Sequence, residues 1–162
     1  MDDLDKKVSE KCTSLNQIPL DYPVWYHPEA ILGSAVRHVA SLSSKFNWVG
    51  IYVLRGQFLE LGPYLGAETV HTQIPVGQGI CGIAVSENRN QNIPDVQSHP
   101  HYLACSLETK SELVVLIRNQ KGTILGQIDI DSHFQNSFGT LEVQAVEEVA
   151  HQLGIFWPLT TE

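Results

Sequence analysis

Three acidic residues occupy positions at which they could bind a cation or transfer a proton. Asp129 and Asp131 are two residues apart in an alternating segment, so their side chains share one face of a predicted strand. Glu112 opens an apolar run, where a charge is costly unless it is paired or used. If these strands are neighbours, the three acids converge and can bind an ammonium group or keep one carboxyl protonated as a general acid. The alternative is that Asp129 and Asp131 form a solvated face.

Two of the three cysteines are candidates for thiol chemistry. Cys105 lies near His99 and His101, and a neighbouring imidazolium favours the thiolate. Cys81 lies in a turn with glycines at 77, 79 and 82, which permit close approach of the backbone to a small ligand. Two thiols at one cavity would provide an attacking and a resolving sulfur. The alternatives are a buried structural Cys81 and an inert loop thiol at Cys105.

Two aromatic residues are candidates for a ligand-binding wall. Trp48 and Tyr52 are four residues apart in a predicted strand, so they share a face and could line an apolar pocket. Core packing is the alternative. The histidines and cysteines form no short C-x-x-C or H-x-x-x-H pair, so no metal site is predicted.

The elements that must position these residues follow from hydrophobic periodicity and turn signals. Helices are expected at 4–15, 28–44 and 80–87, and from Thr140 as N-cap with Glu142 in the first turn. Strands are expected at 46–54, 58–64, 70–74, 91–93, 113–117 and 123–131, with a long loop at 95–111. Helices at both ends of a mostly antiparallel sheet predict an α+β domain.

Composition limits the class of protein. The 162 residues are 43% hydrophobic, enough for one buried core, and we expect a lead-in segment at 1–27 and a single domain at 28–162. With 18 acidic and 10 basic residues, the net charge of −8 argues against a nucleic-acid partner. No apolar run is long enough for a membrane span, and the N-terminus has no secretory h-region. The expected localisation is cytoplasmic.

Several segments together resemble a known family. They are NWVGIY (47–52), LGPY (61–64), IPVGQGICG (74–82), PDV (94–96), AC (104–105), KSELVV (110–115) and GQIDIDS (126–132). Through them the chain resembles the free methionine-(R)-sulfoxide reductases, single GAF-domain enzymes, from about Pro28 to Phe156. The resemblance implies a GAF domain, in which a central antiparallel β-sheet is flanked by N- and C-terminal helices.

The resemblance also implies a reaction, that of an L-methionine (R)-S-oxide reductase. Cys105 would attack the sulfur of free methionine-(R)-sulfoxide while a carboxylic acid protonates the departing oxygen, leaving methionine and a sulfenic acid. Cys81 would then form a disulfide that thioredoxin reduces, with no bound cofactor. Because the family often forms dimers, a homodimer is also implied.

The remaining site residues take their implied roles from the same family. Glu112, Asp129 and Asp131 match an acidic cluster that holds the substrate's ammonium and, through Glu112, assists at the sulfoxide oxygen. Trp48 and Tyr52 match an aromatic wall around its methyl group.

Two positions depart from the family pattern. His71 stands where the family usually has a third, resolving cysteine, and Ser106 stands where it typically has Asp. Recycling would then depend on Cys81 or on an outside thiol. The second hypothesis is a non-catalytic GAF module that binds a small amino-acid-like ligand or senses redox state.

Overall fold

The computed structural model describes residues 28–104 and 106–157. The predicted helix at 4–15, together with Cys12 and Cys105, lies outside these residues. One antiparallel sheet organises the described chain, with its strands in the order β3-β2-β1-β6-β5-β4. The strands are β1 (Trp48–Arg55), β2 (Phe58–Leu65), β3 (Gln73–Pro75), β4 (Gln91–Ile93), β5 (Ser111–Arg118) and β6 (Ile124–Ser132). The predicted antiparallel α+β architecture is confirmed.

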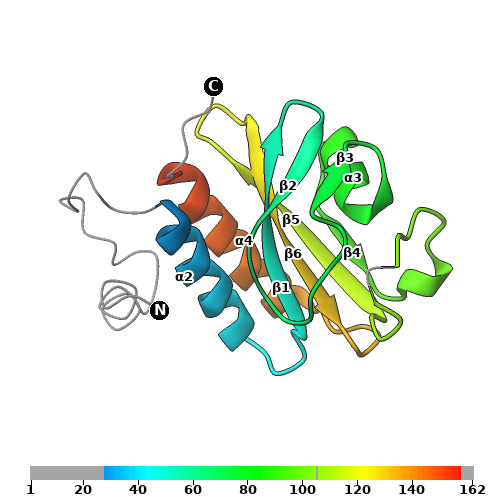
Figure 1. Cartoon of the computed structure of the whole chain (residues 1–162). Coiled ribbons are helices and arrows are strands. Elements are labelled where there is room, and N and C mark those ends of the chain that lie inside the picture. Colours follow the sequence, from blue (N-terminus) through cyan, green and yellow to red (C-terminus); the bar gives the residue numbers. More distant parts are fainter. Residues whose placement is uncertain (1–27, 105, 158–162) are drawn as a thin grey trace.

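Two long helices cover one face of the sheet, and a short helix lies on the other side (Figure 1). The long helices are α2 (Pro28–Ser41) and α4 (Thr140–Ile155), and the short one is α3 (Gly79–Ser86). Proline suits the first turn of a helix, where its missing N–H has no intrahelical partner. Leu32, Val36 and Val39 then bury one stripe of α2 against the sheet.

Alternation along the central strands produces two separate apolar clusters. The cluster beneath α2 and α4 takes every second residue of β1, β5 and β6, including Val49, Leu113 and Ile130. The cluster on the α3 side takes the intervening residues, including Tyr52 and Val114. Because side chains of a strand point alternately to opposite faces, Asp129 and Asp131 lie on the α3 side of the sheet.

Three local predictions need correction. The strand predicted at 70–74 is β3, Gln73–Pro75, because Val70 is 87% exposed and Gln73 is the first residue that pairs with β2. Thr140 is not the N-cap of α4: Gly139 is the extended capping residue, and no side chain caps the helix. The predicted loop at 95–111 contains a 3-10 turn, η2 (Val96–Ser98), and its last residue begins β5.

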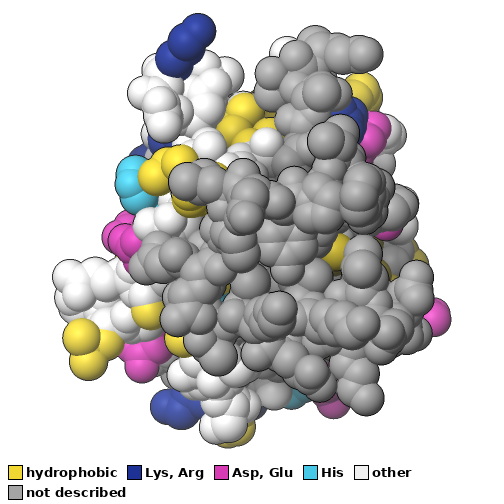
Figure 2. All heavy atoms as spheres, turned by 90° about the vertical axis from the view of Figure 1, so that its left-hand side faces the viewer, with side chains coloured by type: hydrophobic (Ala, Val, Ile, Leu, Met, Phe, Trp, Pro, Cys, Tyr) yellow, Lys and Arg dark blue, Asp and Glu magenta, His cyan; other side chains and the backbone are white. Residues whose placement is uncertain are grey.

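At the margin of the view in Figure 2, where described side chains are visible, both acidic and basic side chains lie on the surface. No helix in the described part of the chain is both long and apolar enough to cross a membrane.

Candidate active site

A cavity of about 90 Å³ lies on the α3 side of the sheet. Its floor comes from β1 and β6, and segments around residues 67–69 and 106–109 form the other walls. The lining residues are Asn47, Trp48, Tyr52, Ala67, Glu68, Thr69, Ser106, Glu108, Thr109, Asp129, Asp131 and His133. Four of the predicted site residues, Trp48, Tyr52, Asp129 and Asp131, therefore meet at one cavity.

The three predicted carboxylates converge because β6 lies between β1 and β5. Asp131 pairs with Glu112 on one side and with Trp48 on the other. Asp129, two residues earlier on the same face, pairs with Val114. The side chains are almost entirely enclosed: Glu112 is 6% exposed, Asp129 4% and Asp131 6%. The alternative of a solvated acidic face is therefore wrong.

Burial changes the protonation of this cluster. Burial raises the pKa of Asp129 to about 7, although hydrogen bonds from the Cys81 thiol, the Glu112 carboxyl and the Ile130 backbone N–H oppose the increase. The pKa of Glu112 lies well above its usual range, first because of burial and then because Asp129 and Asp131 repel a further negative charge. The pKa of Asp131 is also raised well above its usual range, first by burial and then by repulsion from the Asp129 carboxylate. At neutral pH, the site therefore stores protons that a carboxyl such as Glu112 can donate.

Cys81 reaches this cluster from α3. Its thiol is 4% exposed, and Sγ lies 4.0 Å from Glu112 Oε1, with the thiol as donor. Neither Cys81 nor Glu112 is among the residues that line this cavity, but both contact Asp129, which does line it. Cys81, Glu112 and Asp129 place their donor atoms within 4.8 Å of one another, which is the spacing of a metal site. A cation there would have to displace protons from carboxyls whose pKa values are raised, which weakens metal binding at neutral pH.

The aromatic wall depends on a glycine between its two members. The ring centroids of Trp48 and Tyr52 are 6.4 Å apart, and Trp48 stacks on Tyr64 at 5.5 Å. A Cβ on Gly50 would lie 2.3 Å from Cη2 of Trp48. The indole ring can therefore lie across the strand only because position 50 has no side chain.

The polar ends of the two wall residues hold a neighbouring segment in place. Trp48 Nε1 donates a hydrogen bond to Ala67 O at 3.1 Å, and the Tyr52 hydroxyl donates to His71 O at 2.8 Å. His71 Nε2 in turn lies 3.5 Å from Ala104 O. His71 thus lies beside Ala104, the residue that precedes Cys105 in the sequence. Cys105 itself lies outside the described residues.

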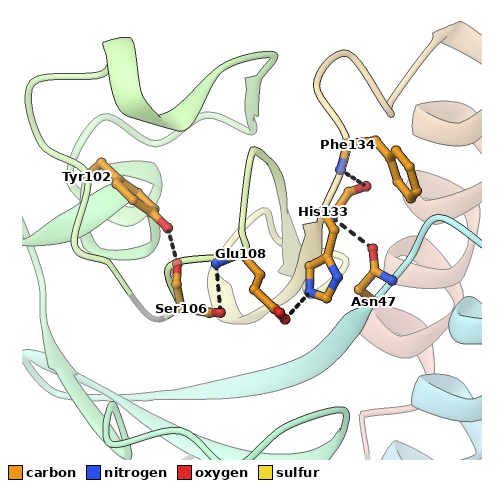
Figure 3. A network of polar contacts seen from close by, with 7 residues as sticks. Asn47, Tyr102, Ser106, Glu108, His133 and Phe134 are labelled. Carbon is orange, nitrogen blue, oxygen red and sulfur yellow. Dashed lines mark hydrogen bonds and ion pairs between the residues drawn. The ribbon is translucent and has the colours of Figure 1, made fainter.

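A set of polar contacts at the cavity wall was not singled out by sequence reasoning (Figure 3). His133 Nε2 lies 3.5 Å from Glu108 Oε2, and the His133 backbone N–H donates to Asn47 Oδ1 at 2.8 Å. Ser106 Oγ accepts from the Glu108 backbone N–H at 3.1 Å, and Ser106 O accepts from the Tyr102 hydroxyl at 3.3 Å. One feature of the sequence could have identified His133: it continues the every-second-residue series of Asp129 and Asp131.

The chain is similar in sequence and in fold to proteins of a known family. A sequence model of the GAF domain matches residues 27–156. The free methionine-R-sulfoxide reductases of Saccharomyces cerevisiae and Escherichia coli are 39% and 38% identical to the chain. These matches cover 68% and 66% of the chain and span 62% and 64% of the two relatives. The structure of type II free methionine-R-sulfoxide reductase from Thermoplasma acidophilum superposes with a TM-score of 0.75 at 35% identity, covering 78% of this chain and 89% of that one.

Proposed function

The chain belongs to the GAF-domain family, among the free methionine-(R)-sulfoxide reductases, and we propose that it reduces free methionine-(R)-sulfoxide to methionine with thiols as the reductant. The observation that carries this proposal is a set of buried, proton-holding carboxyls beside an aromatic wall: Asp129 and Asp131 line the small cavity, and Glu112 lies next to them. A module that only binds a ligand or senses redox state is not favoured, because several similar proteins are named reductases.

Substrate binding would use both features of the cavity. The Asp129 and Asp131 carboxyls would hold the substrate's ammonium, since an opposite charge nearby favours their ionised form. The rings of Trp48 and Tyr52 would enclose the methyl group. Water has little access to the acids, so their interaction with the ammonium is weakly screened.

The chemical step requires a nucleophile and a proton donor. In the proposed reaction, the Cys105 thiolate attacks the sulfoxide sulfur while Glu112 supplies a proton to the oxygen. The attack forms a bond between the Cys105 sulfur and the sulfoxide sulfur. The protonated oxygen then transfers to the Cys105 sulfur while its bond to the substrate sulfur and the new sulfur–sulfur bond both break, so methionine leaves with the electron pair and Cys105 becomes a sulfenic acid. The raised pKa of Glu112 supports this role, because a carboxyl that is protonated at neutral pH can act as a general acid.

Recycling would proceed through Cys81. Its thiol would attack the sulfenic acid and release water, and the dithiol of thioredoxin would then reduce the disulfide, so no bound cofactor is needed. This step requires the Cα atoms of Cys81 and Cys105 to lie within about 7 Å, and the Cys81 thiol would exchange its contact with Glu112 for the bond to the Cys105 sulfur. Thioredoxin-dependent recycling operates in a reducing compartment, and we therefore propose the cytoplasm. We also propose a homodimer, on the family resemblance.

An NADPH-coupled thioredoxin assay with separate epimers of free methionine sulfoxide tests this function. We expect consumption of the R epimer alone. Cys105→Ser should abolish activity, whereas Cys12→Ser should leave it unchanged. If neither thioredoxin nor dithiothreitol supports consumption of the R epimer, the proposed function is wrong.

A second variant tests the recycling step separately. Cys81→Ser should block thioredoxin turnover and still release a single-turnover burst of methionine. A full multi-turnover rate in this variant would show that an outside thiol, and not Cys81, resolves the sulfenic acid.

A further inference from the structure

The acidic side chains that line the cavity can bind the ammonium group of an amino acid but not its carboxylate. The lining residues include four acids, Glu68, Glu108, Asp129 and Asp131. Among the described residues that line the cavity, His133 is the one side chain that can become positively charged. A free amino acid carries an α-carboxylate as well as an ammonium, and four acids would repel that carboxylate unless a donor received it.

We propose that His133 binds the α-carboxylate of the substrate and thereby selects the free amino acid over a methionine sulfoxide within a peptide chain. This inference rests on the proposed function, because it assumes an amino-acid substrate in this cavity. It assigns a specificity-determining role to a residue that takes no part in the redox chemistry.

The backbone places His133 next to the acid that would hold the ammonium. His133 follows Asp131 by two residues, and both side chains line the cavity. Asn47 ties this stretch to β1, since its backbone N–H donates to Asp131 O at 2.9 Å and its Oδ1 accepts from the His133 N–H at 2.8 Å. His133 is the first residue after β6 and lies in a bend, so its Cα is at most about 7 Å from that of Asp131. A zwitterion has both charged groups on one carbon, so it can lie between a carboxyl and an imidazole at this spacing.

A carboxylate already lies beside the imidazole in this structure. Glu108 Oε2 is 3.5 Å from His133 Nε2, as Figure 3 shows. Both side chains are accessible, with His133 40% and Glu108 74% exposed, and ion pairs this exposed contribute little free energy. A substrate carboxylate can therefore replace Glu108 at the imidazole. In this view Glu108 is a competitor for the position and weakens substrate binding.

Paired substrates distinguish this role from a general structural one. We would compare free methionine-(R)-sulfoxide with its α-carboxamide, in which the negative charge is absent, on the full chain with dithiothreitol as reductant. His133→Asn should raise KM for the free acid about tenfold, the loss expected for one charge-assisted hydrogen bond, with kcat almost unchanged. KM for the carboxamide should not change. Glu108→Gln should lower KM for the free acid severalfold and leave the carboxamide unaffected.

The matched control is His38→Asn, the same chemical change on α2, on the opposite face of the sheet. It should leave KM for both substrates at the wild-type value. Equal increases in KM for both substrates in His133→Asn, or no increase for the free acid, would overturn the inference.

Two further measurements keep the test independent of folding and of turnover. If His133→Asn loses its cooperative thermal transition, His133→Gln takes its place in the same comparison. If the wild-type protein does not turn over the R epimer, the proposed function fails. Calorimetric titration with methionine and with methioninamide then still tests whether His133 binds the carboxylate.

Discussion

Asp129→Asn should make the protein more stable at alkaline pH while it impairs substrate binding. The pKa of Asp129 is raised from 3.8 to about 7 because the folded protein removes this carboxyl from water. The folded state therefore holds a proton that the unfolded chain has already released between about pH 4 and pH 7. Stability must fall as the pH increases through this window, because folding there requires uptake of a proton.

The size of the effect follows from the same shift. Each unit of pKa difference corresponds to 1.36 kcal/mol, so deprotonated Asp129 reduces the free energy of unfolding by about 4 kcal/mol above pH 7. Asparagine has a similar shape and no charge, so Asp129→Asn should recover much of this free energy at pH 8 and little at pH 4. The pKa values of Glu112 and Asp131 are also raised. The free energy of unfolding of the variant should therefore still decrease with increasing pH, but less steeply than that of the wild type.

Urea unfolding from pH 4 to pH 8, followed by tryptophan fluorescence, measures this directly. The wild-type free energy of unfolding should decrease across the range, and the decrease should be smaller in Asp129→Asn. The control is Glu29→Gln, which removes an exposed carboxylate of α2 on the opposite face of the sheet. Its free energy of unfolding should follow the wild-type curve. A wild-type stability that rises from pH 5 to pH 8, or an identical slope in Asp129→Asn, would refute the reasoning.

Three further substitutions test other parts of the site. Gly50→Ala places a Cβ 2.3 Å from Trp48 Cη2, so it should displace the ring, reduce stability by about 1–3 kcal/mol and raise KM for the sulfoxide; an unchanged KM would contradict the proposed wall. Tyr52→Phe removes the hydrogen bond to His71 O and should lower the free energy of unfolding by about 1 kcal/mol, as measured in urea. Gln127 is fully buried, and within the described part of the chain its side-chain amide has no hydrogen-bond partner, so Gln127→Met should raise the free energy of unfolding by about 1–2 kcal/mol; a lower melting temperature would refute this expectation.

Much of the element pattern was predictable because it depends on local periodicity. The alternation of Asp129 and Asp131 with isoleucines predicted a strand with both acids on one face, and the structure confirms this. The same reasoning correctly placed Trp48 and Tyr52 together. It was weakest at β3, where a short edge strand that ends in proline has too few residues to establish a pattern.

The sequence by itself determined which side chains share a strand face, because the direction of a side chain follows from its position in an extended backbone. Only the tertiary structure decided that the acidic face is buried, because this depends on β6 lying between β1 and β5 and on α3 covering that side of the sheet. The contact of Cys81 with Glu112, and that of His133 with Glu108, each join residues from separate elements. Such contacts follow from long-range strand pairing and packing, which no local pattern of residues encodes.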